Sequence, residues 1–209
     1  MRILGLTGGI AMGKSTAAKV IRGLGVPVHD ADAAVHRLYG KGGSAVAPIA
    51  ARFPEALHEE AIDRAALSRA IVKEPARLAE LEAVLHPLVR AATQAWLRRQ
   101  ARQRHRLVVL DIPLLYETGG ERLCDAVLVV SAPAFLQRQR ALARPGMSPA
   151  KLEAILNRQV GDAERQRRCD YLVPTGLGRG FAFRRLRAAL TAERQAGPGY
   201  WPSRRRRRR

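Results

Sequence analysis

Near its N-terminus the chain reads Gly8-Gly9-Ile10-Ala11-Met12-Gly13-Lys14-Ser15-Thr16, between an apolar run at residues 3–6 and a segment with helical character. The spacing G-x-x-x-x-G-K-S lets a chain wrap round a polyphosphate with successive backbone N–H groups pointing inward, because glycine permits the close approach. Lys14 would reach the β- and γ-phosphates, Ser15 would offer its hydroxyl to Mg²⁺, and the helix would direct its positive end at the anion. The pattern predicts that residues 8–16 bind a nucleoside triphosphate.

Apolar runs recur along the chain and predict strands at residues 2–6, 26–29, 107–110, 126–130 and 171–173. The clearest runs are apolar throughout rather than alternating, which is typical of strands covered by helices on both faces. Ala-, Leu- and Arg-rich stretches with helical periodicity separate them. We therefore expect an α/β fold of the P-loop NTPase type, with a mainly parallel sheet flanked by helices.

Two helical segments interrupt this alternation. Residues 44–103 hold no convincing strand and predict a helical insertion that shapes the pocket for a phosphate acceptor; within it Asp63 caps one helix, Pro75 starts another and Pro87 breaks it. Residues 138–168 are rich in arginine and predict a mobile helical lid over the phosphates. The domain we expect therefore spans residues 1–196, with a core of 1–43, 104–137 and 169–196.

The composition is strongly basic. Lys and Arg total 37 against 18 Asp and Glu, for a formal net charge of +19. This excess suits nucleotides, CoA-like molecules or nucleic acid, and charge alone does not choose among them. Six of the charges form an arginine run at residues 204–209, in a stretch (197–209) that we expect to be disordered and to bind nucleic acid only non-specifically.

The cysteines and the hydropathy bear on location. Cys124 and Cys169 are the only cysteines, without the density of a secreted scaffold or a metal-ligand spacing, which indicates a reducing cytoplasm. No segment approaches the ~20 apolar residues that a membrane span needs. We expect a cytoplasmic protein that does not bind membranes, and a monomer.

Carboxylates follow two of the predicted strands. Asp30 and Asp32 follow the second, where ligands sit in an open α/β sheet; one carboxylate could accept a proton from an acceptor hydroxyl or position Mg²⁺. Either could instead only cap the following helix, and the spacing leaves the two roles unassigned. Asp111 follows the apolar run 107–110 as in a Walker B element, whose carboxylate supports Mg²⁺. Ser15 and Asp111 are therefore the candidate metal ligands.

Four local motifs together resemble the dephospho-CoA kinase family. They are Leu6-Thr7-Gly8-Gly9-Ile10 with Gly13-Lys14-Ser15-Thr16, Asp30-Ala31-Asp32, Leu85-His86-Pro87-Leu88, and Asp111-Ile112-Pro113-Leu114-Leu115-Tyr116-Glu117. A looser match, Gln137-x-x-Arg140-x-x-x-Arg144, continues into the lid, and Gln159 falls where the family places a glutamine. The resemblance covers roughly the first 175 residues.

The resemblance implies transfer of the ATP γ-phosphate to the ribose 3′-hydroxyl of dephospho-CoA, the last step of CoA synthesis, with Mg²⁺. It implies that Asp32 is the catalytic carboxylate, that Lys14 bridges the transferring phosphate, and that Arg140 and Arg144 clamp it from the lid. It also implies the residues that hold dephospho-CoA: Asp32, His86, Pro87, Leu114 and Glu117.

Three features depart from the family pattern. Met12 stands where a small residue is usual, Pro174-Thr175-Gly176 replaces a D-N-x-G-like end of the fifth strand, and the arginine tail has no counterpart. Two other interpretations remain: a P-loop kinase for nucleoside monophosphates, and a nucleotide-regulated RNA- or DNA-binding protein. The D-A-D and D-I-P-L-L-Y-E motifs argue against the first, and the 5% aromatic content argues against the second.

Overall fold

The computed structural model describes residues 1–74, 76–199 and 201. Its contacts divide the chain into two compact units, one made of Met1–His29 with the chain from Gln100 onward, the other made of Asp30–Arg99. The division made from the sequence, with an insertion over residues 44–103, stays a prediction. The second unit begins earlier, at Asp30.

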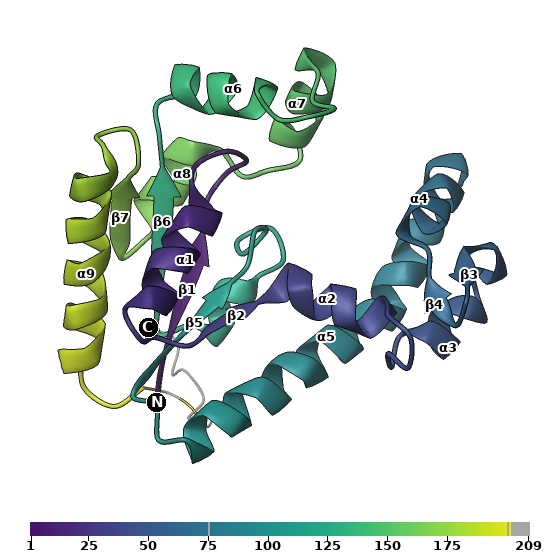
Figure 1. The fold of residues 1–209 in the computed structure, drawn as a ribbon, viewed down its shortest axis with the longest axis horizontal. Coiled ribbons are helices and arrows are strands. Elements are labelled where there is room, and N and C mark those ends of the chain that lie inside the picture. Colours follow the sequence, from purple (N-terminus) through teal and green to yellow (C-terminus); the bar gives the residue numbers. More distant parts are fainter. Residues whose placement is uncertain (75, 200, 202–209) are drawn as a thin grey trace. The chain divides into compact units, whose positions relative to one another are not determined.

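A five-stranded sheet with the order β2-β5-β1-β6-β7 forms the centre of the first unit (Figure 1). Its strands are β1 (Arg2–Thr7), β2 (Val28–Asp30), β5 (Leu107–Asp111), β6 (Ala126–Ser131) and β7 (Tyr171–Pro174). The pairs β1–β5, β1–β6 and β6–β7 are parallel, with Leu6 opposite both Asp111 and Leu128. All five predicted strands are present, and the α/β fold with a parallel sheet is confirmed.

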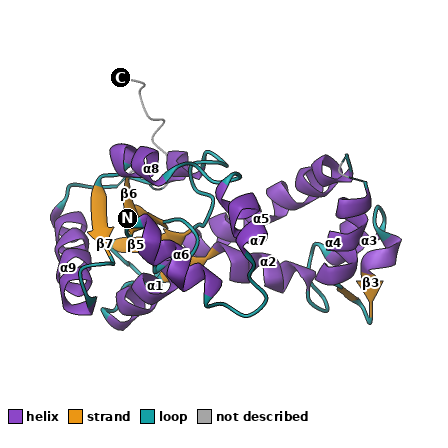
Figure 2. Cartoon of the chain, turned by 90° about the horizontal axis from the view of Figure 1, so that it is seen from above, coloured by secondary structure: helices purple, strands orange, loops and turns teal. Residues whose placement is uncertain are grey.

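Helices cover the sheet because its strands are apolar on both faces. The helices and turns of this unit are α1 (Lys14–Gly23), η2 (Gly120–Leu123), α6 (Ala134–Leu142), α7 (Pro149–Leu156), α8 (Asp162–Arg168) and α9 (Arg179–Gln195). Seen from above, α8 and α1 lie on opposite sides of the sheet (Figure 2). Buried residues of α1 and α9, such as Ile21 and Leu190, pack on Leu4, Val109 and Val130 of the strands in one apolar core.

Glu193 joins three elements at the end of the sheet where β1 and β7 begin. Its carboxylate accepts hydrogen bonds from Arg2 Nε at 2.7 Å and from the Tyr171 hydroxyl at 2.9 Å. Burial, together with this bond to Glu193, raises the pKa of Tyr171 to about 12, so the phenol stays protonated and donates to Glu193 even in alkaline solution. The network ties β1, β7 and α9 together at the amino ends of the strands, and the carboxyl ends of the strands remain available to ligands.

The second unit is mainly helical. It holds α2 (Ala31–Tyr39), α3 (Val46–Ala50), η1 (Pro54–Ala56), β3 (Leu57–His58), β4 (Ala61–Ile62), α4 (Arg64–Lys73) and most of α5 (Arg77–Arg102). Its apolar core centres on Phe53, which is fully buried, with Ile49, Leu67 and Leu81 around it. The expected N-cap is confirmed: the Asp63 side chain accepts the N–H of Ala65 at 2.8 Å.

Two local predictions for this unit were wrong. Pro87 does not break its helix, because α5 runs through it from Arg77 to Arg102; a proline costs the helix one hydrogen bond, and Leu85 and Leu88 on either side pack on the core of the unit. The segment also contains strand, since β3 and β4 pair antiparallel. Glu59 and Glu60 form the turn, and both have positive φ. Hairpin turns of this kind are usually recognised by Gly, Asn or Asp, so two glutamates do not predict one. Pro75 and the tail at 202–209 lie outside the described residues.

Candidate active site

The phosphate-binding loop lies at the carboxyl edge of the parallel sheet, where the ends of neighbouring strands meet. Gly13 has φ of 93°, a left-handed conformation that glycine adopts without strain, and it caps α1, which begins at Lys14. The first turn of α1 therefore presents its backbone N–H groups and its positive dipole end at the loop. The predicted order of strand, loop and helix is confirmed.

Lys14 and Asp111 meet at this edge. Lys14 Nζ lies 2.6 Å from Asp111 Oδ1, and Asp111, the last residue of β5, is only 3% exposed. β5 pairs with β1, and this pairing places its final carboxylate beside the strand that leads into the loop. The phosphate-binding lysine and the Walker B carboxylate predicted from separate parts of the sequence are thus in direct contact.

The donor set at this edge fits a magnesium ion that is also held by a nucleotide. Ser15 is exposed in the first turn of α1, next to the lysine that touches Asp111. Mg²⁺ prefers oxygen ligands and commonly takes only one or two from the protein, with phosphates and waters completing the shell. The described residues contain no cluster of three or more His, Cys, Asp or Glu side chains that could hold a metal without a nucleotide.

Met12 does not crowd the loop, because its side chain points into the apolar core and is 1% exposed. Its sulfur accepts the N–H of Ala132 at 3.0 Å, just beyond the end of β6. Its carbonyl accepts the hydroxyl of Thr175 at 2.8 Å, just beyond the end of β7. The methionine at position 12 therefore adds a contact through its sulfur to the middle of the loop, whereas its carbonyl contact does not depend on the residue type.

Thr175 also holds a lid arginine. Arg140, on α6, donates from Nη1 to the Thr175 hydroxyl at 3.2 Å and from Nη2 to the Thr175 carbonyl at 3.1 Å. The planar guanidinium is thereby fixed by two parallel contacts beside the loop. Arg144 is exposed beyond the end of α6. Sequence analysis noted Thr175 only as part of a departure from the family pattern and gave it no role, because a threonine after a strand gives no signal of its own.

The lid and the adjacent Gln137 contact the loop through Ile10 and Ala11. The Gln137 side chain donates to the Ile10 carbonyl at 3.0 Å, and the Ile10 N–H donates to Gln159 Oε1 at 3.2 Å. Ile10 and Ala11 share a small apolar cluster with lid residues, among them Ala141 and Leu152. The two glutamines that contributed to the family resemblance thus bind the same residue of the loop.

Glu117 and Leu114 follow β5. Leu114 is 41% exposed, so it can contact a ligand. Glu117 Oε1 instead accepts the N–H of Val160 at 2.8 Å and Nη2 of Arg165 at 3.1 Å. Its other oxygen, Oε2, is buried and has no hydrogen-bond partner among the described residues.

In the second unit, Asp30 and Asp32 have different surroundings. The Asp30 side chain caps α2, accepting the N–H of Ala33 at 2.9 Å, so its role as an N-cap is confirmed. Asp32 is exposed in the first turn of the same helix, and His86 and Pro87 are exposed on α5. The structure therefore separates the capping carboxylate from the one that remains available to a ligand.

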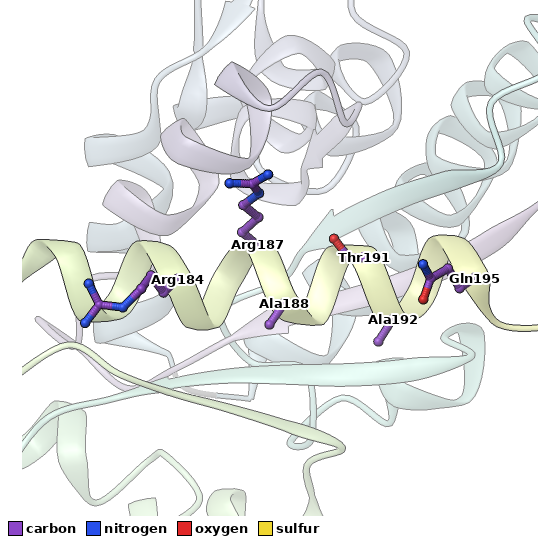
Figure 3. A pocket seen from close by; sticks show the side chains of 6 residues that line it. All are labelled: Arg184, Arg187, Ala188, Thr191, Ala192 and Gln195. Carbon is purple, nitrogen blue, oxygen red and sulfur yellow. The ribbon is translucent and has the colours of Figure 1, made fainter.

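A hollow of about 440 Å³ runs along α9 (Figure 3). It is lined by Arg184, Arg187, Ala188, Thr191, Ala192 and Gln195. This lining has no carboxylate, thiol or imidazole, and thus no general base that could activate the Thr191 hydroxyl for catalysis. Within the part of the chain that the structure describes, no helix is both long and apolar enough to span a membrane.

Comparison with known proteins shows the family of this chain. The family model described as dephospho-CoA kinase matches residues 2–176. The chain is 54% identical over 193 residues to a dephospho-CoA kinase of Rhodospirillum rubrum, covering 92% of each chain. It is 58% identical over 166 residues to one of Paramagnetospirillum magneticum, covering 79% of this chain and 78% of the relative. A crystal structure of a Thermus thermophilus protein superposes with a TM-score of 0.81 at 35% identity, covering 94% of this chain and 98% of that one.

Proposed function

The chain belongs to the dephospho-CoA kinase family and is a kinase of the final step of CoA biosynthesis, and we propose which of its residues carry the reaction. The substrates are ATP and dephospho-CoA, whose ribose 3′-hydroxyl receives the γ-phosphate. The observation that carries the proposal is the contact of Lys14 with Asp111 at the mouth of the loop. It brings a phosphate-binding cation and a metal-binding carboxylate to one place.

On the nucleotide side, residues 8–16 surround the phosphates with backbone N–H groups, and Lys14 leaves Asp111 to contact the transferring phosphate. Arg140, already fixed by Thr175, supplies a second cation, and Arg144 supplies a third from the exposed end of α6. Phosphoryl transfer requires little covalent chemistry from the protein, so most of the catalysis comes from these positive charges, which stabilise the transferring phosphate. Ser15 and Asp111 would hold Mg²⁺, which neutralises charge on the phosphates when it is bound.

On the acceptor side, Asp32 accepts the proton of the 3′-hydroxyl as the oxygen attacks phosphorus. Its neighbour Asp30 is engaged as a helix cap, which favours Asp32 for this role. His86, Pro87 and Leu114 are exposed and bind dephospho-CoA. Glu117 Oε1 is already bound to Val160 and Arg165 and Oε2 is buried, so the contribution of Glu117 to acceptor binding is indirect.

The protein works as a cytoplasmic monomer, and its arginine tail binds nucleic acid only non-specifically. The deciding experiment measures ATP consumption with dephospho-CoA, AMP, CMP and RNA in parallel. We expect turnover with dephospho-CoA alone. Faster turnover with a nucleoside monophosphate, or stimulation of ATP hydrolysis by RNA, would contradict the assignment of the acceptor.

A further inference from the structure

A buried ion pair lies behind the phosphate-binding loop. Arg165, on α8, is 2% exposed, and its Nη2 donates to Glu117 Oε1 at 3.1 Å. Arginine is almost never fully buried unless it is paired, because removing its charge from water is costly. Such a pair adds little stability on balance, so its place in the site points to another role.

The other end of the Arg165 guanidinium packs against the loop itself. A Cβ atom built on Gly9 would lie 2.9 Å from Arg165 Nη1 and 3.1 Å from Gln137 Nε2. Gly9 is not among the glycines with positive φ, so its backbone could accept another residue type. A side chain at position 9 would therefore have to displace the Arg165 guanidinium, which fills that space.

The next two loop residues depend on the same segment of the chain. Ile10 is held on both sides of its backbone by Gln137 and Gln159. Ala11 has φ of 60°, a left-handed conformation that costs a residue with a side chain some strain, and it packs in the apolar cluster of the lid. Contacts from residues 137–165 thus determine the path of the loop at residues 9–11.

We propose that Arg165 and Glu117 are positioning residues, which together hold the Gly9–Ile10 turn in the shape that binds the nucleotide phosphates. Glu117 orients the guanidinium through Oε1 and ties it to the Val160 N–H, at the entry to α8. The guanidinium then lies against Gly9, beside the side chains of Gln137 and Met12. This inference rests on the proposed function, because it takes the loop to bind ATP.

The test compares four purified variants with the wild-type protein: Arg165→Gln, Glu117→Gln, the double variant, and Arg167→Gln as a matched control. Arg167 lies on the same helix but is exposed. Calorimetry gives the Kd for ATP, and steady-state assays give kcat and the KM for dephospho-CoA. We expect the ATP Kd to rise about 10–100-fold in both single variants, since small misplacements of binding groups have effects of this size. In Arg165→Gln the KM for dephospho-CoA should change less than about twofold, and the Arg167→Gln control should match the wild type.

The double variant distinguishes a pair from two separate contacts. If Arg165 acts on the loop only when Glu117 orients it, the double variant binds ATP no more weakly than Arg165→Gln alone. Additive losses would overturn the pairing. An ATP Kd within about twofold of wild type in either folded single variant would overturn the inference, as would equal weakening of both substrates.

Arg165→Lys keeps the test decisive if the glutamine variants fail to fold. Lysine retains a charge for Glu117 but cannot also reach Gly9, so we expect a near-normal melting temperature with a raised ATP Kd. A normal ATP Kd in this variant would overturn the inference. A wild-type protein that binds ATP but does not phosphorylate dephospho-CoA would overturn the proposed function and leave this inference standing.

Discussion

The phosphate-binding loop and the Asp30–Asp32 segment both follow a strand of the sheet, but tertiary contacts fix them to very different extents. Met12 alone is held by the backbone just beyond β6 and by Thr175 beyond β7, and Ile10 is held by Gln137 and by Gln159 of the lid. In the other segment, Asp30 makes a local capping bond to Ala33, and Asp32 is exposed.

The difference follows from what each region must do. A polyphosphate is stabilised by many donors that are already oriented before it binds, so the loop gains from rigid support. A carboxylate that accepts one proton needs only to reach one hydroxyl when the acceptor is bound. Substitutions around the loop should therefore change nucleotide binding, and substitution of Asp32 should change turnover alone.

The largest effect should come from Asp32→Asn. Asparagine keeps the size and most hydrogen bonding of aspartate but cannot accept the proton, so we expect kcat to fall by roughly 10²–10⁴-fold with little change in KM for either substrate. Because the transition state of phosphoryl transfer is loose, a loss at the small end would still fit. A nearly normal kcat would show that Asp32 is not the proton acceptor, and would contradict the comparison of the loop with the Asp30–Asp32 segment.

Lys14→Ala should follow, with kcat lower by about 10²–10³-fold, because the variant loses a cation that stabilises the transferring phosphate. Circular dichroism should show an intact fold, since Lys14 lies at the loop mouth rather than in the core. Lys19→Ala, exposed on the same helix, is the matched control and should behave as wild type. A Lys14→Ala variant that keeps most of its activity would contradict the P-loop assignment.

Thr175→Val should have a moderate effect on the nucleotide side only. Valine keeps the shape of threonine but loses the hydroxyl that serves Met12 and Arg140. We expect kcat/KM for ATP to fall about tenfold, the equivalent of one net hydrogen bond of roughly 1–1.5 kcal/mol. Thr118→Val removes a hydroxyl that bonds only within its own turn and should leave kcat/KM unchanged. Equal losses in the two variants would show that the loop does not depend on Thr175.

Asp30→Asn should have the smallest effect, because asparagine caps helices nearly as well as aspartate does. We expect a loss of about 1 kcal/mol or less in the free energy of unfolding, measured by urea denaturation, with near-normal kcat. Together with Asp32→Asn, this variant separates the capping role of Asp30 from the catalytic role of Asp32 within a single motif. If Asp30→Asn is the crippled enzyme, the roles of the two carboxylates are reversed.

Much of the fold and the nucleotide side of the site was readable from the residues. The five strands were found because each is a short apolar run, and buried parallel strands need such runs. The positions of Lys14 and Ser15 at the start of the helix after the loop were predicted correctly, because the spacing of the loop itself determines where they lie. The prediction that Pro87 breaks its helix was wrong because packing of the surrounding helix overrides the local preference of proline. The β3–β4 hairpin was missed because its turn contains no glycine.

By itself, then, the sequence determined which chain segments form the sheet and that a phosphate loop joins β1 to α1, because both depend on residues close together in the chain. The tertiary structure alone decided that Lys14 touches Asp111, that Met12 points into the core, and that Thr175 holds Arg140. It also placed Arg165 against Gly9. Each of these contacts joins residues far apart in sequence, and only the pairing of the strands and the packing of the helices on them set such distances.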